Sequence, residues 1–275
     1  MVWLVLQVMA MMVAALSGFF DQWLGKRAGN DPHLFLATFG LVSLPVTVVG
    51  VVSQPFMWKA ALVGLISGLC FSGALLLYYR AVAMESLLVL ALPGRLVAAL
   101  ALPLNGLIFG EQVSGTQALV FMLLIIGGWL LLGRGGKIRL SRGFWLMVGV
   151  EFLYVTQDML KNMVALEYDA FLMLTWERAG IVLGALLVLA AKKSRADVRL
   201  KISATGTRLR FLLLCRPLAH VLISLLAGLA VQAAGAVTMV VIAGGAYPFV
   251  VAALTYLADT KAPTRLYVYL GAREK

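Results

Sequence analysis

The chain has 275 residues, of which 62% are hydrophobic and only 13% are charged. Soluble domains usually contain about 45–50% apolar and about 25% charged residues. The composition therefore excludes an ordinary soluble protein, and a protein built around membrane-spanning segments is expected. The net charge of +11 must then be judged by where the basic residues lie along such segments.

Nine apolar stretches meet or approach the length of about 20 residues that a helix needs to cross a bilayer. They cover roughly residues 2–20, 33–52, 58–79, 86–109, 116–133, 143–160, 169–191, 211–231 and 233–257. Barrel strands would be shorter and would alternate apolar with polar residues. Backbone groups in lipid must satisfy their own hydrogen bonds, so these stretches predict an all-α polytopic membrane protein. The first stretch lacks a basic leader region and a cleavage site, which favours a permanent helix over a signal peptide.

The fourth stretch contains the sequence LLVLALPGRLVAALALPLNG, in which Arg95 follows Pro93 and Gly94 and precedes Pro103. Proline frees a backbone carbonyl, and freed carbonyls at membrane depth are tolerated against protein or a water-lined space. The ninth stretch has a similar weak point at residues 244–248. Interrupted helices in corresponding positions of two halves point to a transporter site. We expect Arg95 to face a central cavity; the alternative is a kinked packing helix.

The basic residues are distributed very unevenly between the two sides of the membrane. If nine helices alternate in direction, eighteen Lys and Arg fall on one side, whereas only Lys59 and Lys161 fall on the other. Basic loops remain in the cytoplasm. This bias predicts an outside N-terminus in a plasma membrane or bacterial inner membrane. It also explains the high charge without a nucleic-acid partner.

The chain shows signs of an internal repeat around a basic break at residues 134–143. Asp21 and Asp158, which we expect at the ends of the first and sixth helices, lie 137 residues apart, and Asp31 and Asp169 lie 138 apart. A five-helix unit has an odd number of crossings, so its copy must be inverted, as in many secondary transporters. We predict a first repeat at 1–134, a cytoplasmic connector at 135–142, and a second repeat at 143–275. The second repeat would have four complete helices and a short amphipathic tail.

Three segments resemble the drug/metabolite transporter superfamily, specifically its EamA-like permeases. Residues 81–133 are similar to the region of the third to fifth helices, with a Gly110-Glu111 pair closing the fourth and Gly127 and Gly128 near the end of the fifth. Residues 143–178 resemble the sixth and seventh helices, with an aromatic-Arg pattern in Trp176 and Arg178. Residues 233–259 resemble the ninth helix.

The resemblance implies a carrier of small metabolites made of two inverted five-helix bundles around a central cavity. Two features depart from the family pattern. A complete tenth helix is missing, and the charge bias favours an outside N-terminus, whereas family members commonly have both ends in the cytoplasm.

Ionisable side chains within membrane helices are costly and usually face a cavity or a partner. The sixth stretch places Glu151, Tyr154 and Asp158 on one helical face, at positions i, i+3 and i+7. Glu151 is a candidate for transport or proton coupling, or else for a structural ion pair. Asp158 lies near the expected helix end, where solvation alone would account for it.

The later helices add further candidates. Trp176, Glu177 and Arg178 lie near the middle of the seventh stretch, and Arg216 and His220 share a face of the eighth. Arg216 lies one turn from the basic end and could reach the cytoplasm, and His220 could carry a proton or simply pack. The predicted substrate and ion pathway comprises Arg95, Glu151, Tyr154, Asp158, Trp176, Glu177, Arg178, Arg216, His220 and Tyr247.

These features predict a secondary transporter that moves a small polar metabolite, such as an amino acid, by alternating access. No GxxxxGK[ST] motif is present, so the driving force would be a proton gradient or simple exchange. No cofactor or metal is predicted, nor enzyme activity, because HExxH, GxSxG and Asp-rich motifs are missing from the sequence. The alternative is a non-transporting membrane subunit that assembles with a partner through its intramembrane charges. The oligomeric state stays open, with a homodimer as one option.

Overall fold

The computed structural model describes residues 1–84, 103–133, 141–247, 249–251, 253–254 and 256. Within these residues the regular structure is entirely α-helical. The helices are α1 (Val2–Ala28), α2 (Pro32–Ser53), α3 (Trp58–Val82), α5 (Gly115–Gly133), α6 (Arg142–Glu167), α7 (Ala170–Ala190), α8 (Lys192–Ala204), α9 (Thr207–Ala234) and α10 (Val237–Gly244). Residues 103–109 are also helical. The predicted all-α class is confirmed.

Five helical segments among the described residues are long and apolar enough to cross a membrane: Val2–Gly25, Pro32–Ser53, Trp58–Val82, Ala170–Ala190 and Thr207–Ala234. This supports a multi-pass membrane protein. The predicted spans at 116–133, 143–160 and 233–257 also correspond to helical residues, but α6 carries polar groups along its length and α10 stops after eight residues. Of the predicted break at residues 244–248, residue 248 lies outside the described residues; within the rest, a turn at 245–246 follows α10.

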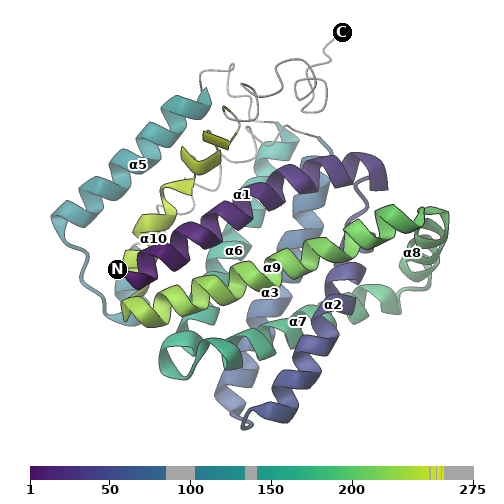
Figure 1. Cartoon of the computed structure of the whole chain (residues 1–275), viewed down its shortest axis with the longest axis horizontal. Helices are drawn as coiled ribbons and strands as arrows, with labels where there is room; N and C mark the ends of the chain where they lie inside the picture. Colours follow the sequence, from purple (N-terminus) through teal and green to yellow (C-terminus); the bar gives the residue numbers. More distant parts are fainter. Residues whose placement is uncertain (85–102, 134–140, 248, 252, 255, 257–275) are drawn as a thin grey trace.

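Helices from the first half of the chain pack against helices from the second half. α3 lies between α6 and α7, α2 packs on α7, and α1 runs beside α9 (Figure 1). Glycines permit the closest of these contacts: a Cβ on Gly68 of α3 would lie 2.1 Å from the backbone oxygen of Glu177 in α7. Small residues serve this purpose in membrane helices, where close backbone approach supplies much of the attraction.

The ends of α2 mark two opposite ends of the bundle. At the first end, Asp31 accepts a hydrogen bond from the backbone of His33 and pairs with Lys201 of α8. Burial raises the pKa of Asp31, but the Lys201 ammonium and the His33 N–H outweigh it, so the pKa lies below its ordinary value. At the second end, Lys59 pairs with Glu167 at 2.6 Å. Both ion pairs join segments that are distant in sequence.

The side chain of Glu111 links the start of α10 to the segment before α5. Its two carboxylate oxygens accept hydrogen bonds from the backbone nitrogens of Val237 and Thr238, each at 2.7 Å. The first N–H groups of a helix have no partner within the helix, and its positive end favours an anion. Gly110 permits the approach, because its φ of 66° is one that other residues rarely adopt. The Gly110-Glu111 pair thus acquires a structural role.

Several helix boundaries differ from those predicted. α1 continues to Ala28 and α6 to Glu167, so Asp21 and Asp158 lie within helices rather than at their ends. Asp31 and Asp169 do begin helices, since each caps the first turn of the helix that follows. α8 was not predicted, because its basic sequence falls between the predicted spans at 169–191 and 211–231.

Candidate functional site

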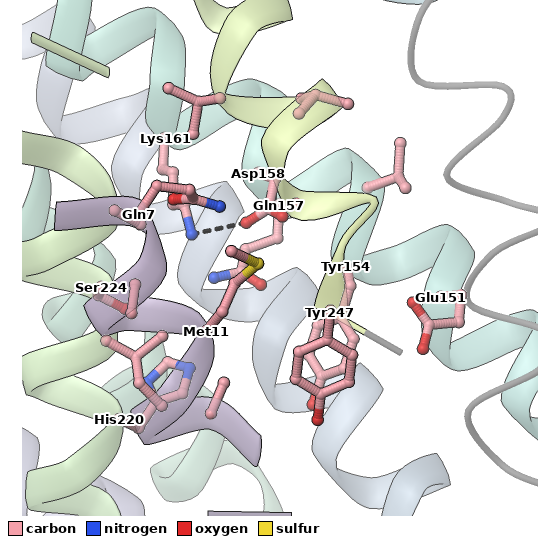
Figure 2. A pocket seen from close by; sticks show the side chains of 18 of the residues that line it. Gln7, Met11, Glu151, Tyr154, Gln157, Asp158, Lys161, His220, Ser224 and Tyr247 are labelled. Atoms are coloured by element: carbon pink, nitrogen blue, oxygen red, sulfur yellow. Dashed lines mark ion pairs between the residues drawn. The ribbon is translucent and has the colours of Figure 1, made fainter. Parts of the chain in front are cut away.

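A cavity of about 430 Å³ lies between α1, α6, α9 and α10. Tyr78 of α3 and Asn105 from the helical residues 103–109 also belong to its lining. Apolar side chains such as Met11 lie among polar and charged groups on this wall, as the close view shows (Figure 2). A pocket that combines apolar walls with a few polar groups is the usual form of a small-molecule site.

One face of α1 lines the cavity along most of its length. Gln7, Met11, Ala14, Gly18 and Asp21 all belong to the wall and follow one another at steps of four, three, four and three residues. This spacing places them in one stripe along a helix. At 1.5 Å per residue the stripe is about 21 Å long. The cavity therefore extends through much of the thickness of a bilayer core.

α6 contributes the most strongly charged part of the wall. Glu151, Tyr154 and Asp158 lie on the cavity side, as their spacing predicted, together with Lys161 (Figure 2). The Lys161 ammonium lies 2.6 Å from the Asp158 carboxylate, and only 10% of the Lys161 side chain is exposed, against 54% of Asp158. Lys161, which the loop count placed outside the membrane, is therefore a cavity residue.

A buried ion pair joins α1 to α9 at one end of the cavity. Arg216 donates from Nε to one oxygen of Asp21 at 2.6 Å and from Nη2 to the other at 2.8 Å. Tyr79 of α3 donates its hydroxyl to the same carboxylate at 2.8 Å. Both Asp21 and Arg216 line the cavity. The expectation that Arg216 extends to the cytoplasm is wrong, because its guanidinium turns inward to this carboxylate.

A second buried network, made of hydrogen bonds and an ion pair, lies behind the cavity wall. The Arg178 side chain is fully buried, and its Nη2 donates to Ser224 of α9 at 2.7 Å and lies 3.2 Å from Glu177. Glu177 also accepts a hydrogen bond from Gln157 of α6 at 2.6 Å. Arg178 and Glu177 therefore connect α7 to two of the cavity helices, α6 and α9, without lining the cavity themselves.

The contact with Arg178 determines which nitrogen of His220 carries the proton. Nη2 of Arg178 lies 2.9 Å from Nδ1 of His220. A guanidinium is always a donor, so Nδ1 must accept, and the hydrogen of the neutral ring is on Nε2. The ring also packs against Phe71 at a centroid distance of 4.1 Å. Protonation at Nδ1 would break the Arg178 contact, so this geometry favours His220 as a fixed hydrogen-bond acceptor rather than a proton carrier.

The remaining predicted residues fall in different places. Tyr247 lines the cavity just after the break that ends α10. Trp176 points elsewhere: its Cβ lies against Gly64 of α3, and its ring meets Phe56 edge-on. Arg95 lies outside the described residues, as do Pro93 and Gly94, so the expected position of this arginine stays a prediction.

Several polar wall residues were not predicted from the sequence, among them Asp21, Lys161 and Gln157, which make the contacts described above. A signal for Asp21 existed: the stripe from Gln7 continues at helical spacing to Asp21 if the first helix is extended beyond residue 20. Among the described residues, the wall carries the carboxylates of Asp21, Glu151 and Asp158 and the cations of Arg216 and Lys161. A wall with both signs of charge suits a polar or zwitterionic molecule better than a purely apolar one.

Comparison with known proteins gives a likeness of fold. No protein-family model matches the chain. No curated protein sequence matches it either. Among solved structures, 22 chains match. One of these, described only as the crystal structure of a protein, has a TM-score of 0.65 and 14% sequence identity, over 98% of this chain and 91% of its own. At that identity the likeness extends to the fold alone, so the resemblance to EamA-like permeases remains a sequence-based prediction.

Proposed function

We propose that this protein is a secondary transporter that moves a small polar metabolite across the membrane by alternating access. The observation that carries the proposal is the cavity itself, which is lined by charged side chains although two of the helices around it, α1 and α9, are long and apolar enough to span a bilayer. Charged groups at membrane depth are expensive and mark substrate or ion pathways when they face a cavity. The mixed charges favour an amino acid or a similar zwitterion.

The packing of the helices supports an inverted repeat as part of the proposal. If α1, α2 and α3 correspond to α6, α7 and α9, then the contact of α1 with α9 is the counterpart of the contact of α6 with α3. The α2–α7 contact is its own counterpart under the same exchange. A repeat of this kind would allow two bundles to rock around a central site, as in other secondary transporters.

The alternative, a membrane subunit that assembles through its intramembrane charges, has less support. Asp21 with Arg216, Glu177 with Arg178, and Asp158 with Lys161 pair within the chain. A charge that is already paired offers little attraction to a partner, because its desolvation is compensated internally.

Flux into liposomes tests the proposal. Purified protein should move radiolabelled amino acids, and Glu151→Gln should abolish or decouple that flux without lowering the amount of folded protein in the membrane. Glu167→Gln provides a matched control, since Glu167 lies on the same helix but in an exposed ion pair outside the cavity. The proposal fails if amino acids, nucleotides and sugars all remain unmoved while the protein co-purifies with a partner. Equal loss of folded protein in Glu151→Gln would mark Glu151 as structural.

A further inference from the structure

The basic helix α8 has a face that the proposed transport cavity does not use. α8 follows α7 directly and precedes α9, and it packs against α7 and α2 at one end of the bundle (Figure 1). Its contacts with the rest of the molecule include the buried side chain of Val198 and the ion pair of Lys201 with Asp31. The helix is therefore docked in a fixed orientation.

Arg195, Val198, Arg199 and Ile202 occupy positions i, i+3, i+4 and i+7 of α8, so they share one face. This face borders a hollow of about 480 Å³. We call it the arginine hollow; its lining consists of Leu189, Arg195, Val198, Arg199, Ile202, Ser203 and Arg210. Three arginine residues thus border one hollow, and the described lining includes no carboxylate.

Arg210 is held in place before any ligand arrives. Its Nε donates to the carbonyl oxygen of Thr205 at 2.7 Å, and its Nη2 donates to that of Ser203 at 3.1 Å. Fixing a guanidinium in this way lowers the entropy that a ligand contact would otherwise cost. The planar donor group of arginine matches the oxygens of a phosphate particularly well.

The position of the hollow relative to the apolar helices indicates the kind of anion. Leu189 is near the end of α7, which is a candidate membrane span, and Arg210 is near the start of α9, which is another. The hollow therefore lies where the apolar segments end, at the depth of lipid headgroups. Ile202 and Leu189 offer apolar contact beside the arginines, and Leu200 is 70% exposed on another side of α8. A basic helix with exposed apolar residues is typical of a membrane interface.

We propose that the arginine hollow binds the phosphate of an anionic phospholipid from the leaflet that α8 faces, with the start of an acyl chain against Leu189 and Ile202. Basic pockets beside membrane helices recognise anionic headgroups in this way. A soluble phosphate would use the arginines but not the apolar residues. The site is separate from the transport cavity, so it stands or fails independently of the proposed transport function.

Lipid retention tests the site. The full chain is reconstituted in vesicles of phosphatidylcholine with a minority of phosphatidylglycerol, extracted in mild detergent, and analysed for bound lipid by native mass spectrometry. The wild type should retain phosphatidylglycerol in preference to phosphatidylcholine. In the double variant Arg195→Gln/Arg199→Gln this preference should fall about 25-fold, because each basic residue near an anionic surface strengthens binding roughly fivefold.

A control variant removes the same charge elsewhere. Lys193→Gln/Arg208→Gln also loses two exposed cations, but neither residue lines the hollow, so the preference should stay within about twofold of the wild type. Equal loss in both variants would overturn the site, since general charge would then explain the preference, and so would an unchanged preference in Arg195→Gln/Arg199→Gln. Inorganic phosphate that displaces the lipid at millimolar concentration would also overturn it, in favour of a soluble anion. Circular dichroism of each variant confirms that α8 and the bundle remain folded.

Discussion

Asp21 and Arg216 form the most tightly bound charge pair among the described residues that line the cavity. They are 195 residues apart in sequence, yet two hydrogen bonds join them, and Tyr79 adds a third to the same carboxylate. Both residues are at least nine-tenths buried. Removing one partner of such a pair leaves a charge that neither water nor protein compensates, which makes the loss far larger than for a surface pair.

A double-mutant cycle measures how strongly the stability of the protein depends on the Asp21–Arg216 pair. Asp21→Asn should lower the apparent free energy of unfolding in detergent by about 3–5 kcal/mol, because Arg216 is then buried without its counter-charge. The double variant Asp21→Asn/Arg216→Gln should lose less unfolding free energy than the two single variants lose together. The difference, which is the coupling energy of the pair, should be about 0.5–3 kcal/mol. Urea titration followed by tryptophan fluorescence provides the values.

Glu167→Gln is the comparison for that cycle. Its pair with Lys59 is about half exposed on both sides, and exposed pairs contribute about 0.2–1 kcal/mol. If Asp21→Asn proved no more costly than Glu167→Gln, or if the cycle showed no coupling, the pair would not be an energetic link between α1 and α9.

Among the helices, the crossing of α3 and α7 depends on two glycines. Gly68 and Gly180 face each other so closely that a Cβ on either would overlap the backbone of the other helix, at 2.1 Å and 2.3 Å respectively. Backbone cannot move aside as a flexible side chain can. The same crossing carries Glu177 and Arg178, so its spacing also positions the network behind the cavity.

We expect Gly68→Ala to destabilise the protein by about 1–3 kcal/mol, as overpacking does in well-packed cores. Gly73→Ala, on the same helix, is the control. A Cβ at Gly73 would meet only the Cδ1 of Leu153, at 3.4 Å. Alanine is favoured over glycine within a helix by roughly 0.5–1 kcal/mol, so Gly73→Ala should be neutral or slightly stabilising. Thermal unfolding in detergent distinguishes the two variants. Similar unfolding temperatures for Gly68→Ala and Gly73→Ala would contradict the close contact of α3 with α7.

The helices could be predicted from the sequence wherever apolar length was the signal, because length and composition are local properties. α8 was missed since its signal is weak: its sequence is strongly basic, and only the spacing of Val198 among its neighbours indicates a packed face. The ends of α1 and α6 were misplaced because Asp21 and Asp158 were expected to end these helices. A buried carboxylate inside a helix needs a partner, and for Asp21 that partner is too distant in sequence to be identified.

Much of the cavity wall could likewise be anticipated on α6, where Glu151, Tyr154 and Asp158 repeat at helical spacing on a single segment. The part that could not be anticipated depends on contacts between segments. Trp176 is adjacent to Glu177 in sequence but turns toward α3, and Arg178 reaches α9 without entering the cavity. Direction around a helix follows from the sequence, whereas the neighbour found in that direction follows from the packing of all the helices.

Considered as one body, the molecule has two chemically different ends. One carries α8 and the Asp31–Lys201 pair, and the other carries the pair of Lys59 with Glu167. Because Lys161 belongs to the cavity rather than to a loop, Lys59 is the only one of the two predicted outer cations that lies at a helix end. The sequence-based count of basic residues on the two predicted sides thus changes from eighteen against two to eighteen against one, and basic segments generally remain in the cytoplasm.

This bias predicts the orientation of the whole chain, which single cysteines can test. In a background with Cys70 and Cys215 replaced by alanine, Ser53→Cys at the end of α2 introduces an exposed thiol, and Ser194→Cys on α8 introduces a partly exposed one. A membrane-impermeant maleimide should label Ser53→Cys in intact cells, but Ser194→Cys only after the cells are permeabilised. The reverse pattern would invert the orientation and place the arginine hollow in the outer leaflet. Labelling of both thiols in intact cells would contradict a bundle that spans the membrane with its two ends on opposite sides.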